Sequence, residues 1–158
     1  MTRAHLVALF ALCACATPPA PRPWTELFDG ASLAGWEVTN FGGEGAVEVV
    51  DGALELDYGS PLTGLTFTGA APSGAYELEL TAARVEGTDF FCGLTFPVRD
   101  AHLTLVLGGW GGSLCGLSNL DGEDAANNDT KRLFRFENGR DYRVLLRVRA
   151  HVVEVLLD

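Results

Sequence analysis

Short runs of alternating apolar and polar residues fill most of this 158-residue chain. Alternation with a period of two is typical of a strand with one buried face, whereas an amphipathic helix repeats every three to four residues. No segment of the sequence shows a sustained helical period. Turn-forming residues separate the runs, as they do in antiparallel sandwiches and barrels. The pattern therefore predicts an all-β fold of about ten short strands, arranged as an antiparallel β-sandwich or a barrel.

The clearest local prediction is a β-hairpin whose turn is Asp51-Gly52. The runs 46–50 and 53–57 flank this dipeptide, and a two-residue Asp-Gly loop favours a type I′ turn. The predicted facing pairs are Val49 with Leu54, Val47 with Leu56, and Glu48 with Glu55.

The same alternation predicts later strands at 74–84, 89–96, 102–107, 114–117, 133–136, 142–148 and 152–157. Residues 89–96 are apolar on both faces, which indicates a central strand covered on both sides. Asn138-Gly139 favours a hairpin between 133–136 and 142–148. The last run stops at Asp158 without a following turn, so we expect closing strands to be missing after it.

The most distinctive stretch is 103–132, in which Trp110 lies between two glycine pairs and ahead of a loop rich in Asp, Asn and Glu. Glycine lets the backbone turn sharply or approach a ligand closely. An indole offers a flat apolar face for a sugar ring, and amides and carboxylates bind hydroxyls. The alternative interpretation is a buried tryptophan at a sheet corner, followed by a solvated loop.

If this stretch acts on a sugar, Asp121 and Asp124 are the candidate acid and base, because glycoside cleavage commonly uses two carboxyl groups. Trp110 is the candidate platform. Further candidate substrate-binding residues are Asn119, Asn128, Asp129 and Arg132. We expect no cofactor, although loop oxygens this dense leave Ca²⁺ open. We expect no other metal, because no CxxC or HxxxH spacing occurs.

The formal net charge of −10 argues against nucleic acid and against an anionic lipid surface, since both require basic patches. The sequence contains no GxSxG motif and no phosphate-cradling loop, so acyl and phosphoryl transfer are not supported. A neutral substrate such as a carbohydrate, a cation or another protein remains open as a partner.

The N-terminus resembles an export signal of the lipoprotein type. Residues 6–12 form an apolar core too short to span a bilayer, and Leu12-Cys13-Ala14-Cys15 is similar to a lipobox. We therefore predict a signal peptide over 1–15, lipidation at Cys15, a proline-rich linker over 16–23 and a β-sandwich domain over 24–158. A signal cleaved near Ala16 is the alternative. In either case the domain is exported, and with the lipid it is anchored in the cell envelope, its only membrane contact.

Export permits disulfides, but Cys92 and Cys115 fall on strands that a meander would separate by one further strand. We therefore expect two buried thiols.

The segment Leu27 to Trp36, LFDGASLAGW, together with the DG hairpin and FENGRDYRVLLRV near the end, resembles the bacterial 3-keto-disaccharide hydrolase domain family. That resemblance implies a concanavalin A-like jelly-roll sandwich, exported and acting on carbohydrate. It favours a hydrolase of 3-keto-disaccharides or other glycosides. The alternatives are a non-catalytic glycan-binding module and a structural domain of the cell envelope.

Overall fold

The computed structural model describes residues 24–158. These residues form two compact units, and the boundary between the units lies between Thr66 and Phe67. The predicted signal peptide, Cys15 and the linker lie outside the described residues. Within 24–158, no helix has the length and apolar character needed to cross a membrane.

The first unit contains three complete strands, β1 (Trp36–Val38), β2 (Val47–Val50) and β3 (Ala53–Leu56). β1 pairs with β4 (Leu65–Phe67), the strand in which the border between the units falls. β2 and β3 form the predicted hairpin, in the predicted register. Asp51 and Gly52 have φ angles of 50° and 83°, the left-handed conformation that both central residues of a type I′ turn require.

The opening motif of this unit is a self-contained loop. One carboxylate oxygen of Asp29 accepts hydrogen bonds from the backbone N–H groups of Ala31 and Ser32, both 2.8 Å long, and the other accepts from the Ser32 hydroxyl. The hydrogen bond from Ala31 is the main reason that the pKa of Asp29 lies below its ordinary value. The Trp36 indole donates to the carbonyl of Leu27. The motif residues therefore shape the chain locally.

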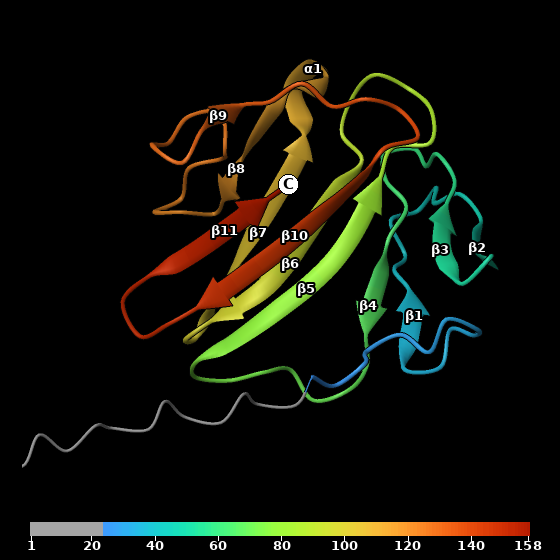
Figure 1. Cartoon of the computed structure of the whole chain (residues 1–158), viewed down its shortest axis with the longest axis horizontal. Helices are drawn as coiled ribbons and strands as arrows, with labels where there is room; N and C mark the ends of the chain where they lie inside the picture. Colours follow the sequence, from blue (N-terminus) through green and yellow to red (C-terminus); the bar gives the residue numbers. More distant parts are fainter. Residues whose placement is uncertain (1–23) are drawn as a thin grey trace, which may run out of the picture. The chain divides into compact units, whose positions relative to one another are not determined.

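The second unit, 67–158, contains two antiparallel sheets (Figure 1). One has the order β11-β10-β5 and the other the order β6-β7-β8-β9. The strands are β5 (Tyr76–Ala83), β6 (Cys92–Val98), β7 (Ala101–Gly108), β8 (Leu114–Ser118), β9 (Arg132–Leu133), β10 (Asp141–Val148) and β11 (Val153–Leu157).

The two sheets of this unit pack face to face around one apolar core. The alternate residues Tyr142, Val144 and Leu146 of β10 are completely buried and meet Phe96 and Leu107 of the other sheet. Burying an aliphatic side chain of this size contributes roughly 1.5–3 kcal/mol, so this row provides much of the stability. The predicted all-β antiparallel sandwich is confirmed.

The prediction of a central strand at 89–96 is wrong. β6 begins at Cys92 and, within the described residues, lies at the edge of its sheet with only β7 beside it. Phe91 precedes the strand and packs edge-on against Phe136, with ring centroids 4.9 Å apart. Its apolar character therefore serves an aromatic cluster at the end of the core and does not mark a second buried face.

The predicted hairpin at Asn138-Gly139 is also wrong, although the turn itself forms with a Gly139 φ of 73°. The strand before it, β9, pairs with β8 and not with β10. The chain therefore crosses here from the β6–β7–β8–β9 sheet to the β5–β10–β11 sheet. It does so because Phe134 and Phe136, which follow β9, pack into the aromatic cluster.

Cys92 and Cys115 are both free thiols, as predicted, but only Cys115 is buried, whereas Cys92 lies at the start of the edge strand β6 and is partly exposed. They pair with opposite sides of the same residue, Leu107 of β7, so a full strand separates them. Burial raises the pKa of Cys92 to about 11, which keeps this thiol protonated and unreactive near neutral pH.

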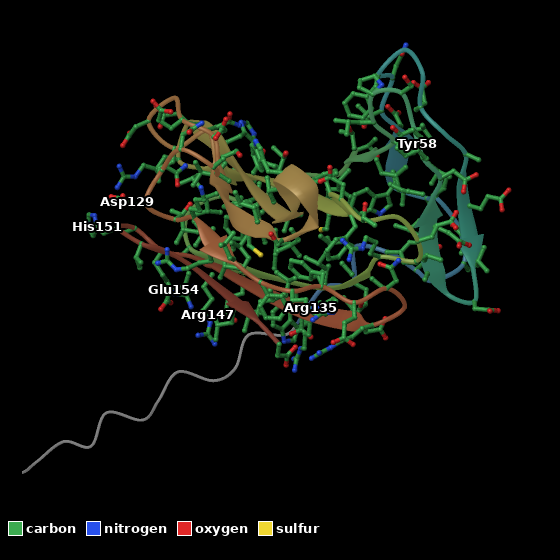
Figure 2. The ribbon with its side chains drawn as sticks, turned by 90° about the horizontal axis from the view of Figure 1, so that it is seen from above. Tyr58, Asp129, Arg135, Arg147, His151 and Glu154 are labelled. Atoms are coloured by element: carbon green, nitrogen blue, oxygen red, sulfur yellow. The ribbon has the colours of Figure 1, made fainter. Side chains whose placement is uncertain are left out.

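The outer face of the β5–β10–β11 sheet carries ion pairs between neighbouring strands. Arg143 donates two hydrogen bonds of 2.9 Å to Glu79, while Arg149 and Arg147 lie 2.6 Å and 3.2 Å from Glu77. Figure 2 shows Arg147 on this outer face, near Glu154. The hydrogen bond from Arg143 holds the pKa of Glu79 below its ordinary value of 4.5.

Because the pKa of Glu79 is depressed in the folded state, its contribution to stability is present above the ordinary value of 4.5 and is lost as pH falls through the folded-state pKa. We expect Glu79→Gln to be less stable than wild type near neutral pH, with the difference shrinking in acid. Urea denaturation at a series of pH values measures this. Glu154→Gln removes a carboxylate from the same face without removing an ion pair, and a difference that grew in acid would contradict the prediction.

Candidate functional site

The β7–β8 connection is a tight turn built almost entirely on left-handed backbone. Gly108, Gly111 and Gly112 have φ angles of 74°, 91° and 93°, and Trp110 itself has φ 49° and ψ 53°. The four residues of α1 (Gly109–Gly112) therefore make one irregular turn and not a regular helix. Left-handed backbone costs a non-glycine residue roughly 1–2 kcal/mol, so the tryptophan is held there by its surroundings.

Two contacts fix this turn in place. The Asp89 carboxylate accepts a hydrogen bond of 3.1 Å from the backbone N–H of Gly111, and Phe134 donates its N–H to the carbonyl of Ser113 at 2.8 Å. A carboxylate bonded to backbone N–H groups is a strong anchor. The turn is therefore supported from both sides.

Trp110 is 53% exposed, so its interpretation as a buried corner residue is wrong. Its indole is available to a ligand from a turn whose backbone is fixed. A large, rigid aromatic side chain loses little conformational entropy when it binds, which is why such residues are frequent contact points.

The acidic stretch at 119–131 is an ordered loop with its own hydrogen bonds. Its first part is a second Asp-Gly turn, in which Asp121 and Gly122 have φ angles of 54° and 84° and Glu123 donates to the carbonyl of Leu120. Asp121 thus occupies the same kind of position as Asp51 in the first unit. Its carboxylate is exposed and makes no hydrogen bond to a described residue.

Asp124 and Asn128 hold the middle of the loop together. One oxygen of Asp124 accepts from the N–H of Ala126 and from the Asn127 amide, both at 2.9 Å. The Asn128 amide donates to the carbonyls of Leu117 and Asp124 at 2.8 Å. Its oxygen accepts from the N–H and the hydroxyl of Thr130. Asn128 thus acts as a structural crosslink.

The remaining candidates lie on the surface. Asn119 and Asp129 are exposed, and Figure 2 shows Asp129 at the outer end of its loop. Arg132 donates to the carbonyls of Asp129 and Lys131, which closes the loop from its far end. Between 24 and 158, no three His, Cys, Asp or Glu side chains are grouped so as to hold a metal ion.

Trp110 and Asp121 do not share one hollow. Trp110 comes before β8 and Asp121 comes after it, so the strand Leu114–Ser118 separates them. At about 3.3 Å per residue the strand alone spans roughly 13 Å. Figure 1 shows α1 and the β8–β9 loop at opposite ends of β8.

The hollow beside Trp110 is formed by other residues. An open depression of about 420 Å³ lies next to the turn, within the size range of small-molecule sites. Its lining is Arg84, Thr88, Gly111, Gly112, Ser113, Leu133, Phe134, Arg135 and Phe136. Leu133 is 74% exposed, so an apolar side chain stands open at this surface.

Arg84 is the buried cation of this hollow, with 8% of its surface exposed. Its guanidinium donates to the side-chain oxygen of Asn138 at 2.6 Å and to the carbonyls of Asp89 and Phe136 at 3.1 Å and 2.9 Å. It also lies over the Phe91 ring, 5.8 Å from the centroid. Arg84 therefore joins three segments around the aromatic cluster, namely the end of β5, residues 89–91 and residues 136–138.

The sequence prediction missed Arg84 and Arg135. The pattern did contain one indication, because Arg84 continues the inward-facing row of β5 that begins with Tyr76, Leu78, Leu80 and Ala82. A charged residue in register with a buried row is unusual. Arg135 has no such indication, since its place at the hollow depends on the crossing between sheets.

No protein-family model, no curated protein and no solved structure matches this chain. The resemblance to 3-keto-disaccharide hydrolases therefore stays a prediction, carried by the motif at 27–36.

Gly111 and Gly112 allow the packing at the turn to be tested. Both have φ near 90°, but a Cβ on Gly112 would overlap the carbonyl oxygen of Thr88, whereas one on Gly111 would meet open space. We expect Gly111→Ala to cost about 1–2 kcal/mol from backbone strain. Gly112→Ala should cost at least about 1 kcal/mol more, because Thr88 must shift. Equal losses in urea denaturation would show that the turn is not packed against Thr88.

Proposed function

We propose that this chain is an exported carbohydrate-active domain that binds glycan at the surface carrying Trp110. The observation that carries the proposal is a half-exposed indole held in left-handed backbone. Strain of this kind persists where the surrounding structure imposes it, and it is frequent at binding sites. The turn geometry does not call for tryptophan here, since asparagine or glycine would fit the backbone with less strain.

The neighbouring hollow supports the same function. Gly111, the residue after Trp110, lines it together with the open side chain of Leu133. A sugar ring has an apolar face for the indole and Leu133, and hydroxyl groups for polar neighbours such as Ser113 and Thr88. Concave, largely apolar sites with a few polar groups are typical of small-ligand binding.

The finer fold and the location belong to this proposal. We propose a concanavalin A-like jelly roll, a fold typical of carbohydrate-binding domains, on the motif at 27–36 and the two packed sheets of 67–158. Export and a lipid anchor at Cys15, in the cell envelope, rest on the pattern of residues 1–23.

Trp110→Ala should abolish glycan binding or weaken it at least about ten-fold, since a central aromatic contact is commonly worth 2 kcal/mol or more. A glycan array, followed by calorimetry on the best ligand, measures this. Trp24→Ala is the matched control, because Trp24 is 56% exposed and lies in the first unit. Equal glycan affinity of wild type and Trp110→Ala would contradict the proposal.

Hydrolysis of 3-keto-disaccharides or related glycosides is the second candidate. The motif at 27–36 favours it, and so do the exposed carboxylates of Asp121 and Asp129, which make no hydrogen bonds to described residues. In this version Asp121 and Asp124 supply acid and base, and the exposed Asn119 and Asp129 contact the sugar, while Asn128 and Arg132 hold the loop in shape. Asp124 keeps one oxygen without a hydrogen bond, so it retains a free acceptor.

Wild type should then cleave a 3-keto-disaccharide, and Asp121→Asn should lower kcat at least about 100-fold, the usual scale for general acid–base catalysis. Asp51→Asn is the control, because Asp51 occupies an equivalent Asp-Gly turn and asparagine tolerates the same backbone. Absence of turnover by wild type, or equal rates for Asp121→Asn and wild type, rejects hydrolysis and leaves the binding function standing.

A further inference from the structure

The charge at the hollow beside Trp110 is opposite to that of the chain as a whole. The formal net charge is −10, yet the two ionisable side chains of the lining are Arg84 and Arg135. Two cations facing one hollow repel each other and favour an anion between them.

Arg84 has no carboxylate partner in the part of the chain that the structure describes. The ion pairs of 24–158 involve Arg143, Arg147 and Arg149, on the outer face of the other sheet. The three hydrogen-bond acceptors of Arg84 are neutral, namely an amide oxygen and two backbone carbonyls. Its charge is therefore desolvated without being neutralised, which is costly unless an anion is bound.

Asp89 does not act as the missing anion. It offers Arg84 its backbone carbonyl, whereas its carboxylate accepts from the N–H groups of Phe90 and Gly111 at 2.8 Å and 3.1 Å. That carboxylate supports the turn and makes no ion pair with Arg84.

The guanidinium of Arg84 still has donors to offer. It has five N–H groups, and each of its three nitrogens makes one hydrogen bond, so one N–H on Nη1 and one on Nη2 remain. Arg135, labelled in Figure 2, is exposed. It makes no hydrogen bond or ion pair with residues 24–158. A planar carboxylate matches such a fork of donors.

We propose that this hollow binds the carboxylate of an acidic sugar, a uronic acid residue, between Arg84 and Arg135. The sugar ring lies along Leu133 towards Trp110. This inference rests on the proposed glycan binding and adds the class of glycan. Arg84 is preorganised by its three hydrogen bonds and its contact with Phe91, and Arg135 closes on the ligand from the surface.

The test compares a glucuronic-acid-containing disaccharide with its carboxyl-reduced counterpart by calorimetry on the full chain. We expect the acidic disaccharide to bind at least about ten-fold more tightly to wild type, with a preference that weakens as salt increases. Arg135→Gln should remove the preference. Arg99→Gln should retain it, because Arg99 is another exposed arginine at the opposite end of β7 from the turn.

Arg84→Lys keeps the charge but loses the fork, so it should also lose the preference. This variant risks misfolding, because Arg84 joins three segments, and the exposed Arg135 keeps the test decisive in that event. Inorganic phosphate is the third probe. Equal affinity for phosphate and for the uronic acid would reveal a general anion site and overturn the assignment to a sugar.

The outcomes separate the two proposals. If the reduced disaccharide binds wild type through Trp110 but no preference for the acidic one exists, the acidic-sugar assignment fails and glycan binding stands. A preference that survives in Arg135→Gln overturns the assignment as well. If neither disaccharide binds, the acidic-sugar assignment fails, and the glycan array with Trp110→Ala decides the proposed glycan binding separately.

Discussion

The burial of two apolar sheet faces against each other is the constraint on which the second unit depends. Tyr142, Val144 and Leu146 have no exposed surface, and they lie on one face of a single strand. The ion pairs on the opposite face are open to water. Because water screens their charges, they contribute little to the free energy of unfolding. Packing in the core therefore fixes the fold, and the charges outside it adjust to a geometry already set.

Tyr142 links this core to the candidate site. Its ring packs against Phe134 and Phe136, with centroids 5.8 Å and 4.9 Å away, and its hydroxyl accepts a hydrogen bond from the N–H of Glu137 at 2.7 Å. The crossing between the sheets is thereby held where it passes over the end of the core. Arg84, bonded to the carbonyl of Phe136, is placed by the same cluster.

Two regions of the second unit thus have different characters. In the acidic loop at 119–131, Asp124 and Asn128 use their polar atoms mainly to maintain the loop. In the hollow, Arg135 remains unpaired within the described chain, and Trp110 and Leu133 stay largely open. A binding surface must retain unsatisfied groups for its ligand, so the hollow fits that role better than the middle of the loop.

The sequence by itself determined what short-range chemistry controls. Alternation predicted most of the strands, and Asp51-Gly52 predicted a hairpin down to its register, because a two-residue turn leaves one pairing. The same turn chemistry also governs Asp121-Gly122. From the sequence, Asp121 was interpreted only as a candidate catalytic residue, and this turn was not predicted. Glycines around Trp110 correctly indicated a sharp turn, but not whether the indole would be exposed.

Tertiary structure alone decided which strands became neighbours and which side chains met. The sequence pattern placed Phe91 on the second buried face of a central strand, but in the structure Phe91 packs in the aromatic cluster. Likewise, β9 pairs with β8 and not with β10. Arg84 and Arg135 are far apart in the chain and line one hollow only because the crossing between sheets passes over the core. Pairing partners and shared hollows depend on long-range packing, and a pattern of period two carries no information about either.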